Sequence, residues 1–155
     1  MSELTDESRF GPAVAQWRAV LGQLRDVVRQ ELVTRQLTPH LPAAESASGP
    51  ARILDAGCGQ GTQAVRLARL GYHVVAIDLS DELLNVARDA LASEPVEVRA
   101  RVELRHGNVL QPQQWGSPGD FDVVCCHGVI MYQPSLDPIL AALAWSLHRA
   151  TSRKP

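Results

Sequence analysis

A glycine-rich loop and two acidic residues carry the most specific chemical signal in this chain. Residues 57–61 read Gly-Cys-Gly-Gln-Gly, and Asp55 precedes them. Glycines let a ligand lie against bare backbone, and the amino end of a following helix offers free N–H groups. Asp78 ends the next apolar run, nineteen residues after Gly59, where a carboxylate can accept both hydroxyls of a ribose. The loop and Asp78 together favour a nucleoside ligand. The alternatives are a plain strand-to-helix turn for the loop and a strand-end carboxylate without a ligand for Asp78.

The three cysteines indicate the chemical environment of the chain. Cys58, Cys125 and Cys126 make an odd number, and the two neighbours in one strand cannot easily bridge each other. This usage is typical of a reducing compartment, so we predict a cytoplasmic protein. Neither Cys125 nor Cys126 has the basic neighbours that would favour a thiolate, so both should pack as small apolar residues.

Alternating apolar and amphipathic segments predict the elements that position these residues. We expect strands at 52–56, 73–77, 102–105 and 122–127, and helices at 60–70, 81–92 and 138–149. Strands that alternate with helices of this length predict an α/β fold, with a parallel sheet covered by helices on both faces. Ser80 should cap the helix that follows it.

The amino-terminal part has a different pattern. Apolar residues three or four apart, from Val14 and Trp17 through Leu21 and Leu24 to Val28, predict a helix over about 12–37. Residues 43–50 are small, polar or helix-breaking, so we expect a surface linker there. The predicted organisation is a helix and linker over 1–50 and a ligand-binding domain over 51–155.

Composition excludes several classes of protein. The chain has 155 residues, 45% of them hydrophobic, and a formal net charge of −2, which fits one globular domain. It has no basic field of the kind that binds a phosphate backbone, so DNA is not an expected partner. No stretch approaches the 18 consecutive apolar residues of a membrane span, and the acidic amino terminus lacks the apolar core of a signal peptide.

The segment 53–61, Ile-Leu-Asp-Ala-Gly-Cys-Gly-Gln-Gly, closely resembles the first motif of class I S-adenosylmethionine-dependent methyltransferases. The resemblance covers about residues 22–147 and implies a Rossmann-like sheet with its strands in the order 3-2-1-4. It also implies that Asp55, Gly57, Cys58 and Gly59 form the loop beneath the methionine part of the cofactor. Thr62 stands where dinucleotide-binding loops have their third glycine, which disfavours an NAD-dependent oxidoreductase.

The resemblance assigns the remaining cofactor-binding residues. Asp78, with Leu79 beside it, would hold the ribose, and Asn108 and Val109 would contact the adenine. Asn108 occupies a position where many family members have an acid; its amide oxygen can still accept a hydrogen bond, although a plain Gly-Asn turn is the alternative. His127 ends the fourth strand and would border the reacting methyl group.

A narrower resemblance includes the amino-terminal helix. The element 22–25, Gly-Gln-Leu-Arg, together with 78–80 and 127–129, is similar to bacterial methyltransferases that esterify a modified wobble uridine of tRNA. In those relatives the arginine contacts the cofactor's methionine carboxylate, a role that would fall to Arg25 here; an exposed helix arginine is the alternative. The acceptor would then be a small molecule or a modified tRNA.

The family chemistry sets the expected mechanism. Methyl transfer is an in-line displacement that needs no metal, and catalysis consists largely of positioning. A carboxylate acceptor needs no base, whereas a hydroxyl or amine does. His127, Tyr132 and His106 are the candidate bases.

The carboxyl-terminal part departs from the family pattern. Family members continue with a fifth, sixth and seventh strand, whereas this sequence ends in the polar, basic segment 148–155. We expect a truncated or frame-shifted chain, with a genuinely shortened protein as the alternative, and we expect this chain to be weakly active or inactive. The strand in 121–127 would form an exposed sheet edge prone to self-association. A non-catalytic cofactor-binding or interaction module is the competing hypothesis.

Overall fold

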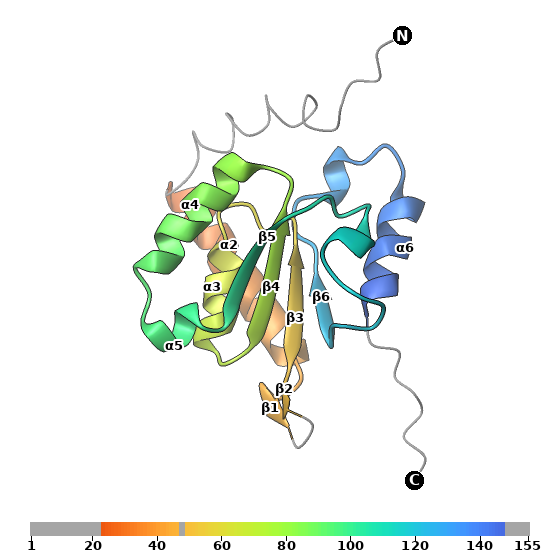
Figure 1. Cartoon of the computed structure of the whole chain (residues 1–155). Helices are drawn as coiled ribbons and strands as arrows, with labels where there is room; N and C mark the ends of the chain where they lie inside the picture. Colours follow the sequence, from red (N-terminus) through yellow and green to blue (C-terminus); the bar gives the residue numbers. More distant parts are fainter. Residues whose placement is uncertain (1–22, 47–48, 148–155) are drawn as a thin grey trace.

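The computed structural model describes residues 23–46 and 49–147, which form a four-stranded parallel sheet with helices on both faces (Figure 1). The strands are β3 (Arg52–Ala56), β4 (His73–Asp78), β5 (Val102–His106) and β6 (Val123–Cys125). Their order, β5-β4-β3-β6, confirms the predicted 3-2-1-4 arrangement. β6 is shorter than the strand predicted over 122–127, because the chain leaves the ladder after Cys125.

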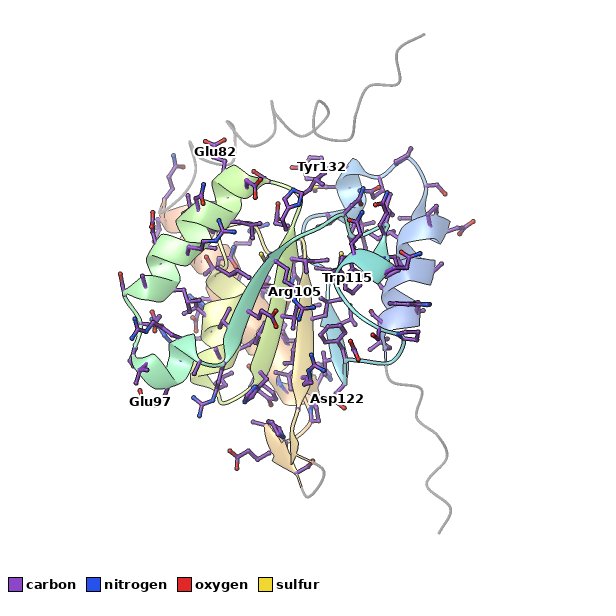
Figure 2. All side chains as sticks on the ribbon, viewed as in Figure 1. Glu82, Glu97, Arg105, Trp115, Asp122 and Tyr132 are labelled. Carbon is purple, nitrogen blue, oxygen red and sulfur yellow. The ribbon has the colours of Figure 1, made fainter. Side chains whose placement is uncertain are left out.

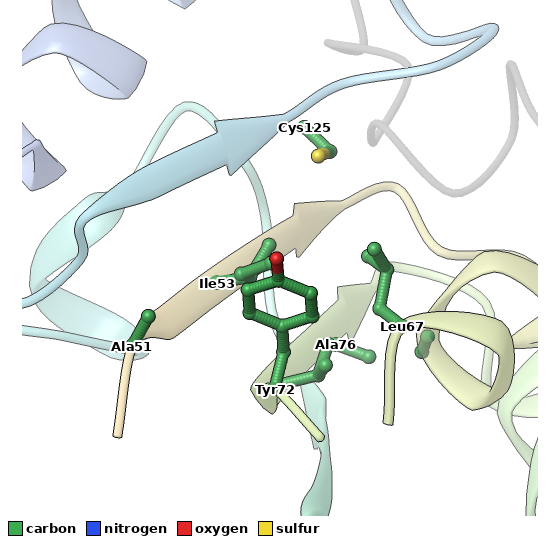
Figure 3. Close-up of a cluster of buried hydrophobic side chains, with 8 residues drawn as sticks. Ala51, Ile53, Leu67, Tyr72, Ala76 and Cys125 are labelled. Atoms are coloured by element: carbon green, nitrogen blue, oxygen red, sulfur yellow. The ribbon is translucent and has the colours of Figure 1, made fainter. Parts of the chain in front are cut away.

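The strands form where apolar side chains are buried on both faces of the sheet. Ile53 lies opposite Val74 on one side and Val123 on the other. Between the sheet and one helical layer lies a first cluster, shown in part in Figure 3: Ala51, Ile53, Ala64, Leu67, Tyr72, Val74, Ala76 and Cys125. Burial on both faces explains why these strands read as continuous apolar runs.

Helices cover both sides of the sheet (Figure 1). One side carries α2 (Leu24–Leu37), α3 (Thr62–Arg69), α4 (Asp81–Ala92) and α5 (Val96–Arg99), and the other carries α6 (Leu136–Ser146). The Oγ of Ser80 accepts the N–H of Leu83 at 3.3 Å, as predicted for an N-cap. α3 begins at Thr62, two residues later than predicted, because the glycine loop extends to Gly61. α6 spans 136–146 rather than 138–149.

The second face is closed by a segment with little regular structure. After β5 the chain forms the 3-10 turn η2 (Pro112–Gln114) and buries Trp115, whose indole N–H donates to the carbonyl of Asn108 at 2.9 Å. The buried cluster here is Leu54, Ala56, Val75, Ile77, Val109, Trp115, Phe121 and Ile139. This second cluster attaches α6 to the sheet.

α2 contacts the domain through its polar face. The predicted residues Val14, Trp17 and Leu21 lie outside the described part of the chain, and α2 begins at Leu24. Leu24 and Val28, which belong to the predicted apolar face, are exposed.

Hydrogen bonds instead join α2 to α3: Gln63 Nε2 donates to the carbonyl and side-chain oxygens of Gln30 at 2.9 and 2.7 Å. An ion pair between Arg66 and Glu31, 2.6 Å apart, supports the same contact. The spacing of apolar residues predicted a helix here, but it did not predict that the polar face of α2 packs against α3.

The predicted linker at 43–50 has more structure than expected. After the 3-10 turn η1 (Thr38–His40), two short strands, β1 (Glu45–Ser46) and β2 (Gly49–Pro50), pair antiparallel. Tyr72 donates its hydroxyl to the carbonyl of Pro42 at 2.7 Å, and Ala51 donates its N–H to the carbonyl of Ala44 at 2.8 Å. These backbone contacts, which side-chain size and polarity do not reveal, hold the segment against the core.

The two edges of the sheet differ in chemistry. The outer strand β5 carries the ion pair of Glu103 and Arg105, 2.7 Å apart, and such charges discourage pairing with another strand. β6 forms the other edge, as predicted, and its residues are apolar. There Phe121 forms a parallel bridge with Leu147, and Phe121 N–H donates to the carbonyl of Ser146 at 3.1 Å. Self-association through this edge stays a prediction.

Among the described residues, no helix combines the length and the apolar composition that a bilayer crossing requires. The cytoplasmic location stays a prediction.

Candidate active site

The glycine loop lies at the carboxyl end of β3 and is tied to the neighbouring strand. The N–H groups of Gly57 and Cys58 both donate to the carbonyl of Ile77 at 2.9 Å, and Gly61 N–H donates to the carbonyl of Cys58 at 3.0 Å. Gly57, Gly59 and Gly61 all have positive φ, between 55° and 77°, a conformation that strains other residues. The backbone of the loop is therefore fixed before any ligand binds.

The three glycines of the loop have different surroundings. A Cβ on Gly57 would lie 2.0 Å from Cγ2 of Val129, and one on Gly61 would lie 2.9 Å from the Cβ of Ala87. At Gly59 a Cβ would meet nothing within 4 Å. The outer two glycines are thus required by packing, whereas the middle one borders open space in which a ligand can approach the backbone.

Asp78 connects the loop to the start of α4. Its Oδ2 accepts the N–H of Gly59 at 2.8 Å, and its Oδ1 accepts the N–H of Ser80 at 2.9 Å. Burial raises the pKa of this carboxyl, although the backbone N–H donors oppose the rise. A carboxylate has about four acceptor positions, and the N–H groups of Ser80, Gly59 and Leu79 act on this one, so it can still accept a ribose hydroxyl.

Asp55 is a buried carboxylate with an incomplete set of partners. Its side chain is 2% exposed, and Oδ2 has no hydrogen-bond partner in the part of the chain that the structure describes. Burial and then the negative charge of Asp78 raise its pKa to about 7, against the opposing effect of the Ala64 N–H. A cationic ligand at this position would stabilise the ionised carboxylate.

His127 follows β6 and is half-buried. Its Nδ1 is buried and lacks a hydrogen-bond partner among residues 23–46 and 49–147. Burial lowers its pKa, and the positive charge of Arg29 lowers it further. The ring is therefore held neutral near pH 7, as a base must be before it accepts a proton.

The cysteines around the loop are poor nucleophiles. Burial, with the negative charges of Asp55 and Asp78, strongly raises the pKa of Cys58, whose Sγ lies 3.7 Å from the carbonyl oxygen of Gly59. Burial also raises the pKa of Cys125 to about 12 and that of Cys126 to about 11. All three stay thiols near neutral pH.

The end of β5 contributes a second group of predicted residues. His106 Nε2 lies 3.0 Å from the carbonyl oxygen of Leu79, next to Asp78. Asn108 Oδ1 accepts the N–H of Leu110 at 2.9 Å, so its amide forms a local turn, and the side chain of Val109 is buried in the second cluster. Roles for these residues in adenine and ribose binding stay predictions.

α2 brings residues to the site that the sequence pattern did not reveal. Gln60 of the loop donates to Oδ2 of the buried Asp26 at 3.3 Å, and Arg29 lies 3.8 Å from Oδ1 of the same carboxylate. Arg25, predicted to bind the cofactor, is exposed on the first turn of α2 beside this contact. The burial of Asp26 and its contact with Gln60 exist only in the folded chain, because the sequence pattern gives no sign that this aspartate is buried.

The candidate base Tyr132 lies in the 3-10 turn η3 (Ile130–Tyr132), which follows His127. Its side chain is 40% exposed and lies at the carboxyl end of the sheet (Figure 2). Within the described ranges, no three His, Cys, Asp or Glu side chains cluster closely enough to hold a metal ion.

Comparison with known proteins supports an assignment to a family. A family model described as "Methyltransferase domain" matches residues 53–150. Magnesium-protoporphyrin O-methyltransferase from Rhodobacter capsulatus is 34% identical over 139 residues, covering 88% of this chain and 55% of the relative. Ubiquinone biosynthesis O-methyltransferase from Xanthomonas campestris pv. campestris (strain B100) is 40% identical over 102 residues, covering 66% and 41%. The chain thus spans about half the length of these curated relatives.

The fold agrees with solved structures. The glycopeptide N-methyltransferase MtfA, crystallised with S-adenosyl-L-methionine, superposes with a TM-score of 0.63 at 23% identity, covering 74% of this chain and 48% of that one. A structural similarity at 23% sequence identity shows a shared fold only. The family model, by contrast, matches more than half of the present sequence. The chain accordingly belongs to the methyltransferase domain family, with the class I, Rossmann-like sheet that its glycine loop predicts.

Proposed function

We propose that this chain binds S-adenosylmethionine and supplies the cofactor-binding half of an enzyme that methylates a small molecule. The observation that carries the proposal is the edge of the sheet at Gly59, where the middle glycine of the loop borders open space and donates its N–H to the Asp78 carboxylate. When bound, the cofactor supplies an electrophilic methyl group on a sulfonium sulfur, which a nucleophilic acceptor atom takes in one in-line displacement.

The residues present suit such a ligand. Gly59 leaves room for a ligand to lie on the backbone, and the Asp78 carboxylate beside it offers an acceptor for a ribose hydroxyl. The unpartnered Oδ2 of Asp55 suits a ligand with positively charged groups, since a cation would compensate the buried negative charge. Arg25 and Arg29, on the first turns of α2, supply positive charge for a carboxylate.

A base is needed only for some acceptors. His127 follows β6 at the carboxyl end of the sheet and is neutral near pH 7, so it is the first candidate to take a proton from a hydroxyl. Tyr132 and His106, which flank the same end of the sheet, are the alternatives. The curated relatives named above are O-methyltransferases, which supports an oxygen acceptor, either a hydroxyl or a carboxylate.

A modified tRNA is the second candidate acceptor. It is supported by the Gly-Gln-x-Arg element at 22–25, whose arginine begins α2 next to the glycine loop. Transfer of a labelled methyl group to undermodified tRNA, compared with transfer to small hydroxylated aromatic acceptors, distinguishes the two.

Cofactor binding is the direct test of this proposal. Calorimetric titration of the chain with S-adenosylhomocysteine should show one site, and Asp78→Asn should weaken binding at least tenfold, because a charged hydrogen-bond acceptor is lost. Asp89→Asn is the matched control, because it makes the same carboxylate-to-amide change at an exposed position on α4. Thermal unfolding of each variant without ligand checks that the fold survives. A folded wild-type chain that binds no S-adenosylhomocysteine would refute the proposal.

A further inference from the structure

Asp26 is a buried carboxylate on α2 to which the proposed function gives no role. Only 8% of it is exposed, and burying a carboxylate costs free energy unless polar or charged groups compensate it. Two side chains do so. Its Oδ2 accepts a hydrogen bond from Nε2 of Gln60 at 3.3 Å, and its Oδ1 lies 3.8 Å from the guanidinium of Arg29. Asp26 therefore lies where α2 meets the glycine loop.

Both partners of this carboxylate border the candidate cofactor site. Gln60 directly follows Gly59, whose N–H donates to Asp78 at 2.8 Å. The side chain of Arg29 is 45% exposed, so a ligand can reach it. Burial and then the positive charge of Arg29 lower the pKa of His127, which follows β6. Since a charge acts strongly only over a short distance, the guanidinium lies near the carboxyl end of β6.

The order of the strands indicates which part of a ligand reaches this cation. The strands lie in the order β5-β4-β3-β6, with Asp78 ending β4 and the glycine loop following β3. A ligand whose ribose lies at Asp78 and which crosses the glycine loop extends toward Arg29 and the end of β6. A guanidinium favours a carboxylate there. S-adenosylmethionine and S-adenosylhomocysteine carry a carboxylate on their amino-acid end and nowhere else.

We propose that Asp26 is a positioning residue that makes the site select ligands with the amino-acid end of the cofactor. It holds Arg29 for the ligand's carboxylate and ties α2 to the glycine loop through Gln60. Its own negative charge repels a carboxylate, so it acts through these partners and not by contact with the ligand. The inference rests on the proposed function and adds to it the residue that sets ligand selectivity.

A purely structural role is the alternative for Asp26. An aspartate in the first turn of a helix stabilises that helix through the helix dipole. Such a role would affect every ligand of the site alike, whereas a positioning role affects only ligands that have the amino-acid end. The two roles therefore differ in selectivity, which binding measurements can detect.

Two ligands that share the same nucleoside test the inference. S-adenosylhomocysteine has the amino-acid end, and methylthioadenosine has a methyl group in its place. In calorimetric titrations, Asp26→Ala should weaken binding of S-adenosylhomocysteine about tenfold and binding of methylthioadenosine by less than about twofold. Arg29→Ala should do the same, and the double variant should bind about as well as the weaker single variant, because Asp26 acts through Arg29. Asp137→Ala, which removes an exposed first-turn aspartate from α6, is the matched control and should change neither affinity.

Three results would overturn the inference while leaving the proposed function intact. They are an equal loss of both ligands in Asp26→Ala, an affinity for S-adenosylhomocysteine that this variant leaves unchanged or raises, and effects of Asp26→Ala and Arg29→Ala that multiply in the double variant. If Asp26→Ala does not fold, Asp26→Asn gives the same comparison, since it keeps an oxygen for Gln60 but loses the charge that holds Arg29. A folded wild-type chain that does not bind S-adenosylhomocysteine would instead remove the proposed function on which the inference rests.

Discussion

Replacing Asp55 by asparagine should change how the stability of this protein depends on pH. In the folded chain the pKa of Asp55 is about 7, against 3.8 for an ordinary aspartate. A carboxyl whose pKa is raised by folding binds its proton more tightly in the folded state, so the stability it contributes is present at low pH. That contribution is lost as the pH rises through 7.

The magnitude follows from the shift. At pH 5 an unfolded chain has released the proton of Asp55, whereas the folded chain keeps it up to about pH 7. Two pKa units at 1.36 kcal/mol each give about 3 kcal/mol of unfolding free energy, which disappears between pH 5 and pH 8. Asp55→Asn has no proton to lose, so this component of the pH dependence should be absent from the variant.

Urea unfolding at pH 5, 6, 7 and 8, in the absence of ligand, measures this effect. Subtracting the curve of Asp55→Asn from that of the wild type should leave a fall of about 3 kcal/mol between pH 5 and 8. Asp89→Asn, which changes an exposed carboxylate, should show no such difference. Parallel curves for wild type and Asp55→Asn, or a wild type that gains stability relative to the variant as pH rises, would refute the reasoning.

Three other predictions concern packing, docking of α2 and the sheet edge. Gly57→Ala should lower the free energy of unfolding in urea by about 2–4 kcal/mol, because it adds backbone strain and a clash with Val129. Gly59→Ala should lower it by about 1–2 kcal/mol from backbone strain alone, but it should abolish S-adenosylhomocysteine binding. Gln63→Ala should speed limited proteolysis within α2, because the half-buried Gln30 on α2 loses its two hydrogen bonds. The free energy of the main unfolding transition should change by no more than about 3 kcal/mol. Self-association through the β6 edge should make the molecular mass measured by sedimentation rise with protein concentration. Leu140→Lys adds charge to the exposed face of the adjacent α6 and should weaken this association. A molecular mass that is the same at all concentrations would contradict the prediction.

Local patterns in the sequence determined most of the framework. The four strands, the Ser80 cap and the glycine loop were predicted because each depends on side-chain period, turn chemistry or a single hydrogen bond three residues away, whereas the order of the strands came from the resemblance to a known family. The loop also identified the ligand class, since glycine spacing and the acid at the end of the next strand are read along the chain. The family match over 53–150 agrees with that interpretation.

Only the tertiary structure decided how distant residues share the site. The polar face of α2 docks because Gln63 meets Gln30 across 33 residues, a pairing that no local period encodes. Val129 reaches Gly57, and Leu147 pairs with Phe121, through connections that the chain makes only when folded. The pKa of Asp55 belongs to the same class: an aspartate becomes a weak acid through burial and a second carboxylate nearby, and both of these depend on where the rest of the chain comes to lie.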